Sequence, residues 1–103
     1  ELARTMLGAA KTELHARWPE LRHYAEAEAR KLAQTLVMIE KLKLAGKINR
    51  QQAVLLLDIQ RNTSRTVILT IEGLGLLAAE AAVNAALASI ADTVNKAVGW
   101  RLL

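Results

Sequence analysis

Apolar side chains recur along this chain with the period of an α-helix. The first series falls on every fourth residue and predicts an amphipathic helix over about residues 2–17; it consists of Leu2, Met6, Ala10, Leu14 and Trp18. Because the residue before a proline is disfavoured in the α conformation, a break is expected at Trp18, and Pro19 is well placed to open the next helix.

The second apolar series predicts a helix over about residues 19–45. Gly46 follows it, as glycine often follows a helix C-terminus, and nearby lysines suit the negative end of the helix dipole. Asn49 and Gln52 then have the spacing of a capping box, which predicts the start of a third helix. A connection this short favours an antiparallel helical hairpin.

A seven-residue ladder runs through the second half of the chain without a change of phase. Its rungs are Leu55, Asn62, Leu69, Leu76, Val83, Ile90 and Ala97. The ladder crosses Gly73 and Gly75, each of which costs roughly 1 kcal/mol in a helix interior. Because the phase is kept, the pattern predicts one long helix over about residues 49–98, with a kink near Gly73 as the alternative. Such a helix would be roughly 75 Å long, too long for the second helix to cover.

The ladder and its companion positions predict a seam between copies of the chain. The residues of this predicted seam are Leu55, Ile59, Asn62, Thr66, Leu69, Gly73, Leu76, Glu80, Val83, Leu87, Ile90 and Val94. A buried Asn on such a seam can pair with its symmetry mate and disfavour wrong registers. The polar network expected around it consists of Asp58, Arg61, Asn62 and Arg65. If the helix is rotated, Asn62 instead faces water.

Composition supports a single all-helical domain over residues 1–103. Hydrophobic residues make up 52% of the chain and aromatic residues 3%, with one Pro and no Cys, so a core must consist of aliphatic side chains. A chain of 103 residues is marginal for a self-sufficient core, and association would compensate. Residues 1–50 hold ten basic and six acidic side chains, whereas residues 51–103 hold four of each. Acidic residues are interspersed among the basic ones, so nucleic acid is not the expected partner.

Side chains that could carry out chemistry are sparse. Glu20 and His23 have the E-x-x-H spacing of di-iron bundles, but no second copy of the motif occurs, and His15 with Glu13 does not complete it. Ser64 and Ser89 have no neighbouring His, and Gly73 and Gly75 are not followed by the Lys-Ser or Lys-Thr of a phosphate loop. We therefore expect no catalytic residues, no cofactor and no metal, and hence no enzyme.

Two functions fit these patterns. The first is a self-associating structural, scaffolding or interaction module in the cytoplasm, with its own copies as the expected partner and another protein as the second candidate. The second is a membrane-associated pore former of the holin or toxin kind that inserts residues 67–91. Glu72 and Glu80 oppose insertion, since two central acids cost about 5–7 kcal/mol against roughly 3–6 kcal/mol from the aliphatic side chains. The soluble bundle is therefore the favoured prediction.

Overall fold

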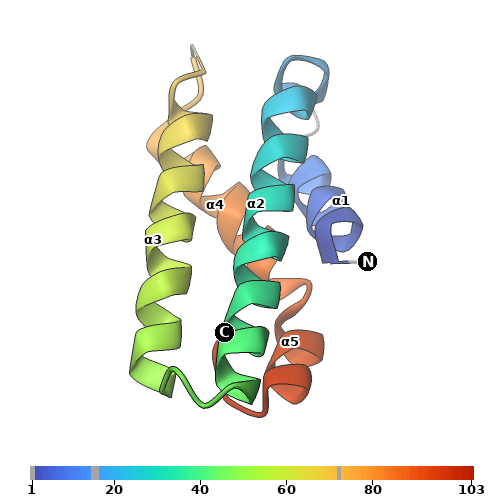
Figure 1. The fold of residues 1–103 in the computed structure, drawn as a ribbon. Helices are drawn as coiled ribbons and strands as arrows, with labels where there is room; N and C mark the ends of the chain where they lie inside the picture. The colour runs from blue at the N-terminus through green and yellow to red at the C-terminus, as the bar shows by residue number, and fades with distance from the viewer. Residues whose placement is uncertain (1, 15–16, 72) are drawn as a thin grey trace.

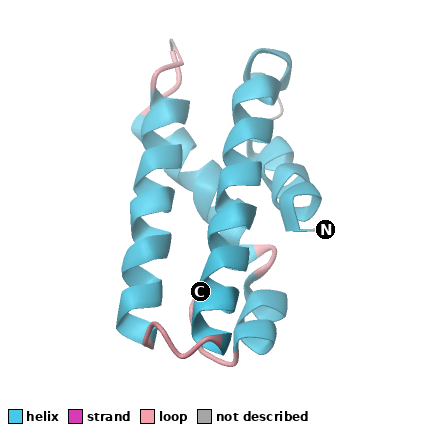
Figure 2. Cartoon of the chain, in the orientation of Figure 1, coloured by secondary structure: helices cyan, strands magenta, loops and turns pink. Residues whose placement is uncertain are grey.

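The computed structural model describes residues 2–14, 17–71 and 73–103, and this part of the chain contains helices and loops without strands (Figures 1 and 2). The helices are α1 (Leu2–Leu14), α2 (Trp18–Leu44), α3 (Arg50–Leu69), α4 (Leu76–Ala88) and α5 (Ala91–Val98). The predicted all-helical class is confirmed. The first two helices lie close to the ranges predicted from periodicity, although α1 ends at Leu14 and residues 15–16 lie outside the described part.

The connection between α2 and α3 follows from local sequence signals. Gly46 adopts φ +69°, a left-handed conformation that glycine enters without a Cβ clash. The amide groups of Gly46 and Lys47 donate to the carbonyls of Lys43 and Leu42, which is the bonding pattern of a Schellman motif. Asn49 then caps α3: its Oδ1 accepts from the Gln52 amide at 2.8 Å, and Gln52 Oε1 accepts from the Asn49 amide at 2.9 Å. The chain thus reverses within a few residues, and α2 and α3 lie side by side in opposite directions (Figure 1).

The prediction of one helix over residues 49–98 is wrong. α3 ends at Leu69, and α4 begins at Leu76 after a loop in which Gly73 has φ +80° and Gly75 is extended at the helix N-cap. β-Branched residues concentrate at the end of α3, where they lower helix propensity. A second break at Ser89 and Ile90 separates α4 from α5, whose axes differ by 51°.

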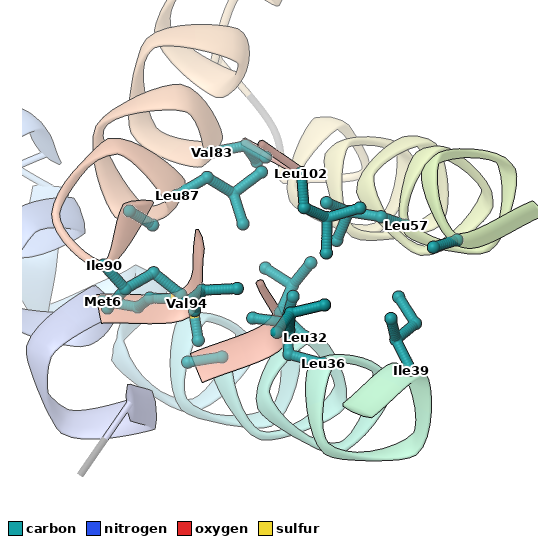
Figure 3. Packing of buried hydrophobic residues seen from close by; sticks show 14 residues of the cluster. Met6, Leu32, Leu36, Ile39, Leu57, Val83, Leu87, Ile90, Val94 and Leu102 are labelled. Atoms are coloured by element: carbon teal, nitrogen blue, oxygen red, sulfur yellow. The ribbon is translucent and has the colours of Figure 1, made fainter. Parts of the chain in front are cut away.

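Because the predicted long helix is broken, its later parts pack against the other helices of the same chain. α4 turns back and packs against α1 and α3, while α5 packs against α2. A core forms from all of these helices and from Leu102, and its side chains point toward one another in Figure 3. The labelled members are Met6, Leu32, Leu36, Ile39, Leu57, Val83, Leu87, Ile90, Val94 and Leu102. A smaller cluster of Leu14, Leu21 and Ala82 lies apart from it. Val83, Leu87, Ile90 and Val94, which follow the break, are therefore buried within the single chain.

Candidate functional site: the outer face of α3 and its adjoining cleft

The first half of the predicted seam lies on the outward face of α3. Leu55 and Ile59 are one turn apart and 62% and 64% exposed. Asn62 and Thr66 continue the same stripe and are also exposed. The opposite face of the helix carries the buried residues Ala53, Leu57, Ser64 and Ile68. We call the stripe of Leu55, Ile59, Asn62 and Thr66 the α3 outer face; none of its four side chains carries a formal charge.

The second half of the predicted seam does not continue this exposed stripe. Leu69 is half-buried near the break, Gly73 lies in the loop, and Leu76 is 52% exposed at the start of α4. The remaining apolar positions, Val83, Leu87, Ile90 and Val94, are buried in the core of the same chain. In the single chain these four positions do not share one continuous face with Leu55. The break after Leu69 turns them inward, so the exposed rungs before the break are the main candidate interface.

A polar cleft of about 390 Å³ lies beside the α3 outer face. It is lined by Asp58, Arg61, Asn62 and Arg65 of α3 and by Glu80, Val83 and Asn84 of α4. Arg65 Nη1 donates to Glu80 Oε1 at 3.0 Å, which ties α3 to α4. The other two charged groups, Asp58 and Arg61, form no ion pair with any described residue. The four residues predicted to form a polar network thus line one cleft, and Asn62 belongs both to this cleft and to the exposed stripe.

The contribution of α4 to the cleft could not be read from the sequence. Asn84 carries no local signal that would associate it with α3, because the contact depends on α4 turning back after the loop. Glu80 was placed on the seam as part of a continuous helix. Its bond to Arg65, fifteen residues earlier, instead spans two helices.

Glu28 is a buried carboxylate that no sequence motif indicated. Glu28 is 4% exposed, its Oε2 accepts from Lys31 Nζ at 3.1 Å, and its Oε1 has no hydrogen-bond partner among the described residues. It borders a small cavity of about 30 Å³ that Ser64 also lines. Ser64 is fully buried and accepts from Gln60 Nε2 at 3.1 Å. A signal was present, because Glu28 is seven residues after the apolar Leu21 and four before Leu32 and therefore shares their helix face.

The other candidate site residues are not brought together in the described part of the structure. Glu20 and His23 are exposed on α2, and Glu20 accepts from Arg17 at 2.8 Å. His15 lies outside the described residues. Over residues 2–14, 17–71 and 73–103, no group of three or more His, Cys, Asp or Glu side chains is placed to hold a metal ion.

The length and hydropathy of the described helices bear on whether they could span a membrane. None of the described helices is by itself long and apolar enough to cross a bilayer, although α4 and α5 together meet the criteria of length and composition despite their 51° bend. Many of the apolar side chains of these two helices are buried in the core of the chain.

Neither a family model nor a curated protein nor a solved structure matches the chain. The candidate site is therefore defined by its own geometry. It offers a narrow uncharged stripe of two apolar and two polar side chains beside a cleft that positive and negative groups both line. Such a surface is suited to packing against another helix.

Proposed function

We propose that the chain is a non-catalytic helical module that associates with its own copies through the α3 outer face. The observation that carries this proposal is the exposure of Leu55 and Ile59 on a helix whose other face is fully used in the core. Exposed Leu and Ile one turn apart, followed by Asn62 and Thr66, have the spacing with which one helix packs along another. The absence of formal charge on the stripe means that two identical faces can meet without repulsion.

Magnitudes indicate that this association is reversible. Full burial of a Leu or Ile side chain contributes about 1.5–3 kcal/mol, so Leu55 and Ile59 from two copies contribute about 6–12 kcal/mol. Association itself costs about 4–15 kcal/mol. Since the largest difference between the two terms is about 8 kcal/mol, which corresponds to a micromolar dissociation constant, we expect a weak dimer that forms between micromolar and millimolar concentration and dissociates on dilution. Leu76 and Leu77, which are 52% and 82% exposed at the start of α4, are a further apolar surface that an extended interface would bury.

Sedimentation velocity over a concentration series tests the proposal. The unmodified chain should change from monomer to dimer as its concentration rises from low micromolar toward millimolar. The double variant Leu55→Glu, Ile59→Glu should stay monomeric, because each interface would then bury carboxylates.

The matched control is Val37→Glu, Met38→Glu, which places two carboxylates on exposed apolar positions of α2. This control should dimerise like the unmodified chain. A chain that remains monomeric at every concentration would contradict the proposal, as would a dimer that only the α2 variant disrupts.

The alternative proposal is a membrane-active protein that inserts residues 67–91. What supports it is the combined length and apolar composition of α4 and α5. It requires the core to open, because Val83, Leu87 and Ile90 would have to leave their packing partners for lipid. Flotation with neutral vesicles separates the two proposals, since only insertion predicts that the protein floats with lipid that carries no net charge.

A further inference from the structure

The whole formal net charge of the protein is located at one end of the fold. Residues 40–50 and 91–103 carry six basic and two acidic side chains, a net charge of +4. The rest of the chain carries eight basic and eight acidic side chains, which cancel. These two segments are the end of α2, the turn into α3, and α5 with the residues after it, which lie together at the bottom of Figure 1. We call this region the basic end; its cations are Lys41, Lys43, Lys47, Arg50, Lys96 and Arg101.

Contacts between the two segments hold the cations together. The Lys43 ammonium group donates to the Val98 carbonyl and lies 5.0 Å from the centre of the Trp100 ring. The Arg50 guanidinium group donates from Nη2 and Nε to the Arg101 carbonyl at 2.9 and 3.1 Å. Because both acceptors are neutral carbonyls, these bonds orient the cations without neutralising them.

Local helix stabilisation accounts for only part of this charge. Lys41 and Lys43 lie in the last turn of α2, where cations stabilise the C-terminus of a helix, and Lys96 does the same for α5. Lys47 and Arg101 lie outside the helices. All of these except Lys43 are exposed, and no side chain among Lys47, Lys96 and Arg101 forms an ion pair within the described structure.

An exposed apolar tip stands among these charges. Leu44 is 79% exposed at the end of α2, between Lys43 and Lys47 in sequence. Trp100 is half-buried and contributes an amphipathic ring to a shallow hollow that Lys96 and Arg101 also line. A nucleic acid would satisfy the cations but would leave Leu44 in contact with water or phosphate. A lipid bilayer has an anionic headgroup layer directly above hydrocarbon and can accept both kinds of group.

We infer that the basic end docks peripherally on an anionic phospholipid surface, with the cations in the headgroup layer and Leu44 entering the acyl boundary. This docking leaves the core folded, so it differs from insertion of residues 67–91. It does not depend on self-association, because none of its residues belongs to the α3 outer face.

Co-sedimentation with vesicles of phosphatidylcholine and phosphatidylserine in equal parts tests the inference, with pure phosphatidylcholine vesicles for comparison. The unmodified chain should bind the anionic vesicles, release at high salt, and leave the neutral vesicles unbound. Each surface Lys or Arg contributes about 1 kcal/mol at such a membrane, so Lys47→Gln, Lys96→Gln, Arg101→Gln should lower the partition coefficient about a hundredfold.

The control with the same net charge is Arg4→Gln, Lys11→Gln, Arg30→Gln, which removes three exposed cations outside the basic end. It should bind almost as well as the unmodified chain. Equal loss in both triple variants would overturn the inference, because binding would then follow net charge alone.

A second pair of variants tests the apolar tip. Leu44→Ser should weaken vesicle binding on the order of tenfold, whereas Val37→Ser, which changes an exposed apolar side chain of α2 outside the basic end and the α3 outer face, should leave it unchanged. Equal effects of the two variants, binding that persists at high salt, or no binding to anionic vesicles would each refute peripheral docking. Displacement from vesicles by duplex DNA, with DNA affinity unaffected by Leu44→Ser, would assign the basic end to nucleic acid instead.

Discussion

At the scale of single residues, the most unusual position is Glu28. A buried carboxylate oxygen without a hydrogen-bond partner destabilises a fold by about 1–3 kcal/mol. The partner of the other oxygen, Lys31, has a half-exposed side chain and would be solvated if the carboxylate were removed. The ion pair therefore contributes less than the orphaned Oε1 costs.

Glu28→Met should accordingly stabilise the chain by about 1 kcal/mol, since methionine can adapt its shape to the small cavity. Urea unfolding followed by helical circular dichroism measures the change. Glu13→Met, at an exposed position of α1, is the control and should alter the free energy of unfolding by less than about 0.5 kcal/mol. A loss of stability in Glu28→Met would show that Oε1 has a partner, such as a water molecule in the cavity.

Glu26, which is half-buried on α2, provides a pH-dependent test. The pKa of Glu26 lies below its ordinary value because Arg22 Nε donates a 2.9 Å hydrogen bond to its carboxylate, with smaller contributions from the charges of Arg22, His23 and Arg30. A carboxyl whose pKa is lower in the folded state stabilises the fold above its unfolded pKa. This stabilisation is lost as the pH falls through the folded pKa.

Arg22→Gln should therefore raise the pKa of Glu26 toward its ordinary value and remove this small acid-side contribution to stability. An NMR titration of the Glu26 carboxyl group measures the shift directly. Arg30→Gln removes one positive charge without breaking the hydrogen bond and should move the same pKa less. Equal shifts in the two variants would mean that charge, and not the hydrogen bond, sets the pKa.

At the scale of helices, the sequence predicted those boundaries that depend on adjacent residues. Gly46 and the Asn49–Gln52 capping box define a helix end and a helix start through bonds made within a few positions. The break after Leu69 is different in kind. A glycine that bends the chain and a glycine that admits a close neighbour inside a helix look alike in sequence, and here the heptad phase happens to continue across the loop. What decides between them is the packing of α4 on α1, which joins residues far apart in the chain.

Gly73→Ala distinguishes the broken helix from a continuous one. The φ of +80° at Gly73 costs an L-residue about 1–2 kcal/mol, so the variant should be destabilised by that amount. In a continuous helix the same substitution would stabilise by roughly 1 kcal/mol. Chemical denaturation measures the sign.

Two further glycines calibrate this experiment. Gly46 also has a positive φ, but a Cβ added there meets open space, whereas one at Gly73 would lie 3.0 Å from Arg17 Nη1. Gly46→Ala therefore isolates the cost of the backbone conformation and should destabilise by about 1–2 kcal/mol. Gly8→Ala lies inside α1 with nothing close to the added Cβ and should stabilise by about 0.5–1 kcal/mol. If Gly73→Ala stabilised the chain while Gly46→Ala destabilised it, the result would support one continuous helix over residues 49–98.

At the scale of the whole molecule, the fold separates an exposed apolar stripe from a basic surface. The sequence pattern predicts the whole seam on one long helix and shows the excess of basic side chains in residues 1–50. In the structure the later apolar rungs fill the core, the early rungs remain outside on α3, and the net charge gathers at one end. The early rungs could be identified from the sequence because they share one unbroken helix. The basic end could not, because it depends on α5 returning to the end of α2.

Substitution of Asn62 should affect the association of whole molecules more than the stability of the single chain. Because it is exposed in the single chain, Asn62→Leu should leave the unfolding free energy of dilute protein within about 0.5 kcal/mol of its original value. The substitution extends the apolar stripe of Leu55 and Ile59, so it should strengthen association and raise the apparent stability as protein concentration increases. It should also widen the distribution of oligomers, since the polar position that penalises alternative registers is lost.

Thermal unfolding over a concentration series, combined with sedimentation, measures both effects of Asn62→Leu. Gln34→Leu is the matched control, because it also replaces an amide side chain with leucine, at an exposed position of α2 outside the α3 outer face and its cleft. Its melting temperature should depend on concentration no more than that of the unmodified chain. If Asn62→Leu shows the same concentration dependence as Gln34→Leu, association does not pass through the α3 outer face. If Asn62→Leu instead lowers stability in dilute solution, the amide contributes to the fold of the single chain through the cleft that it shares with Asp58 and Arg61.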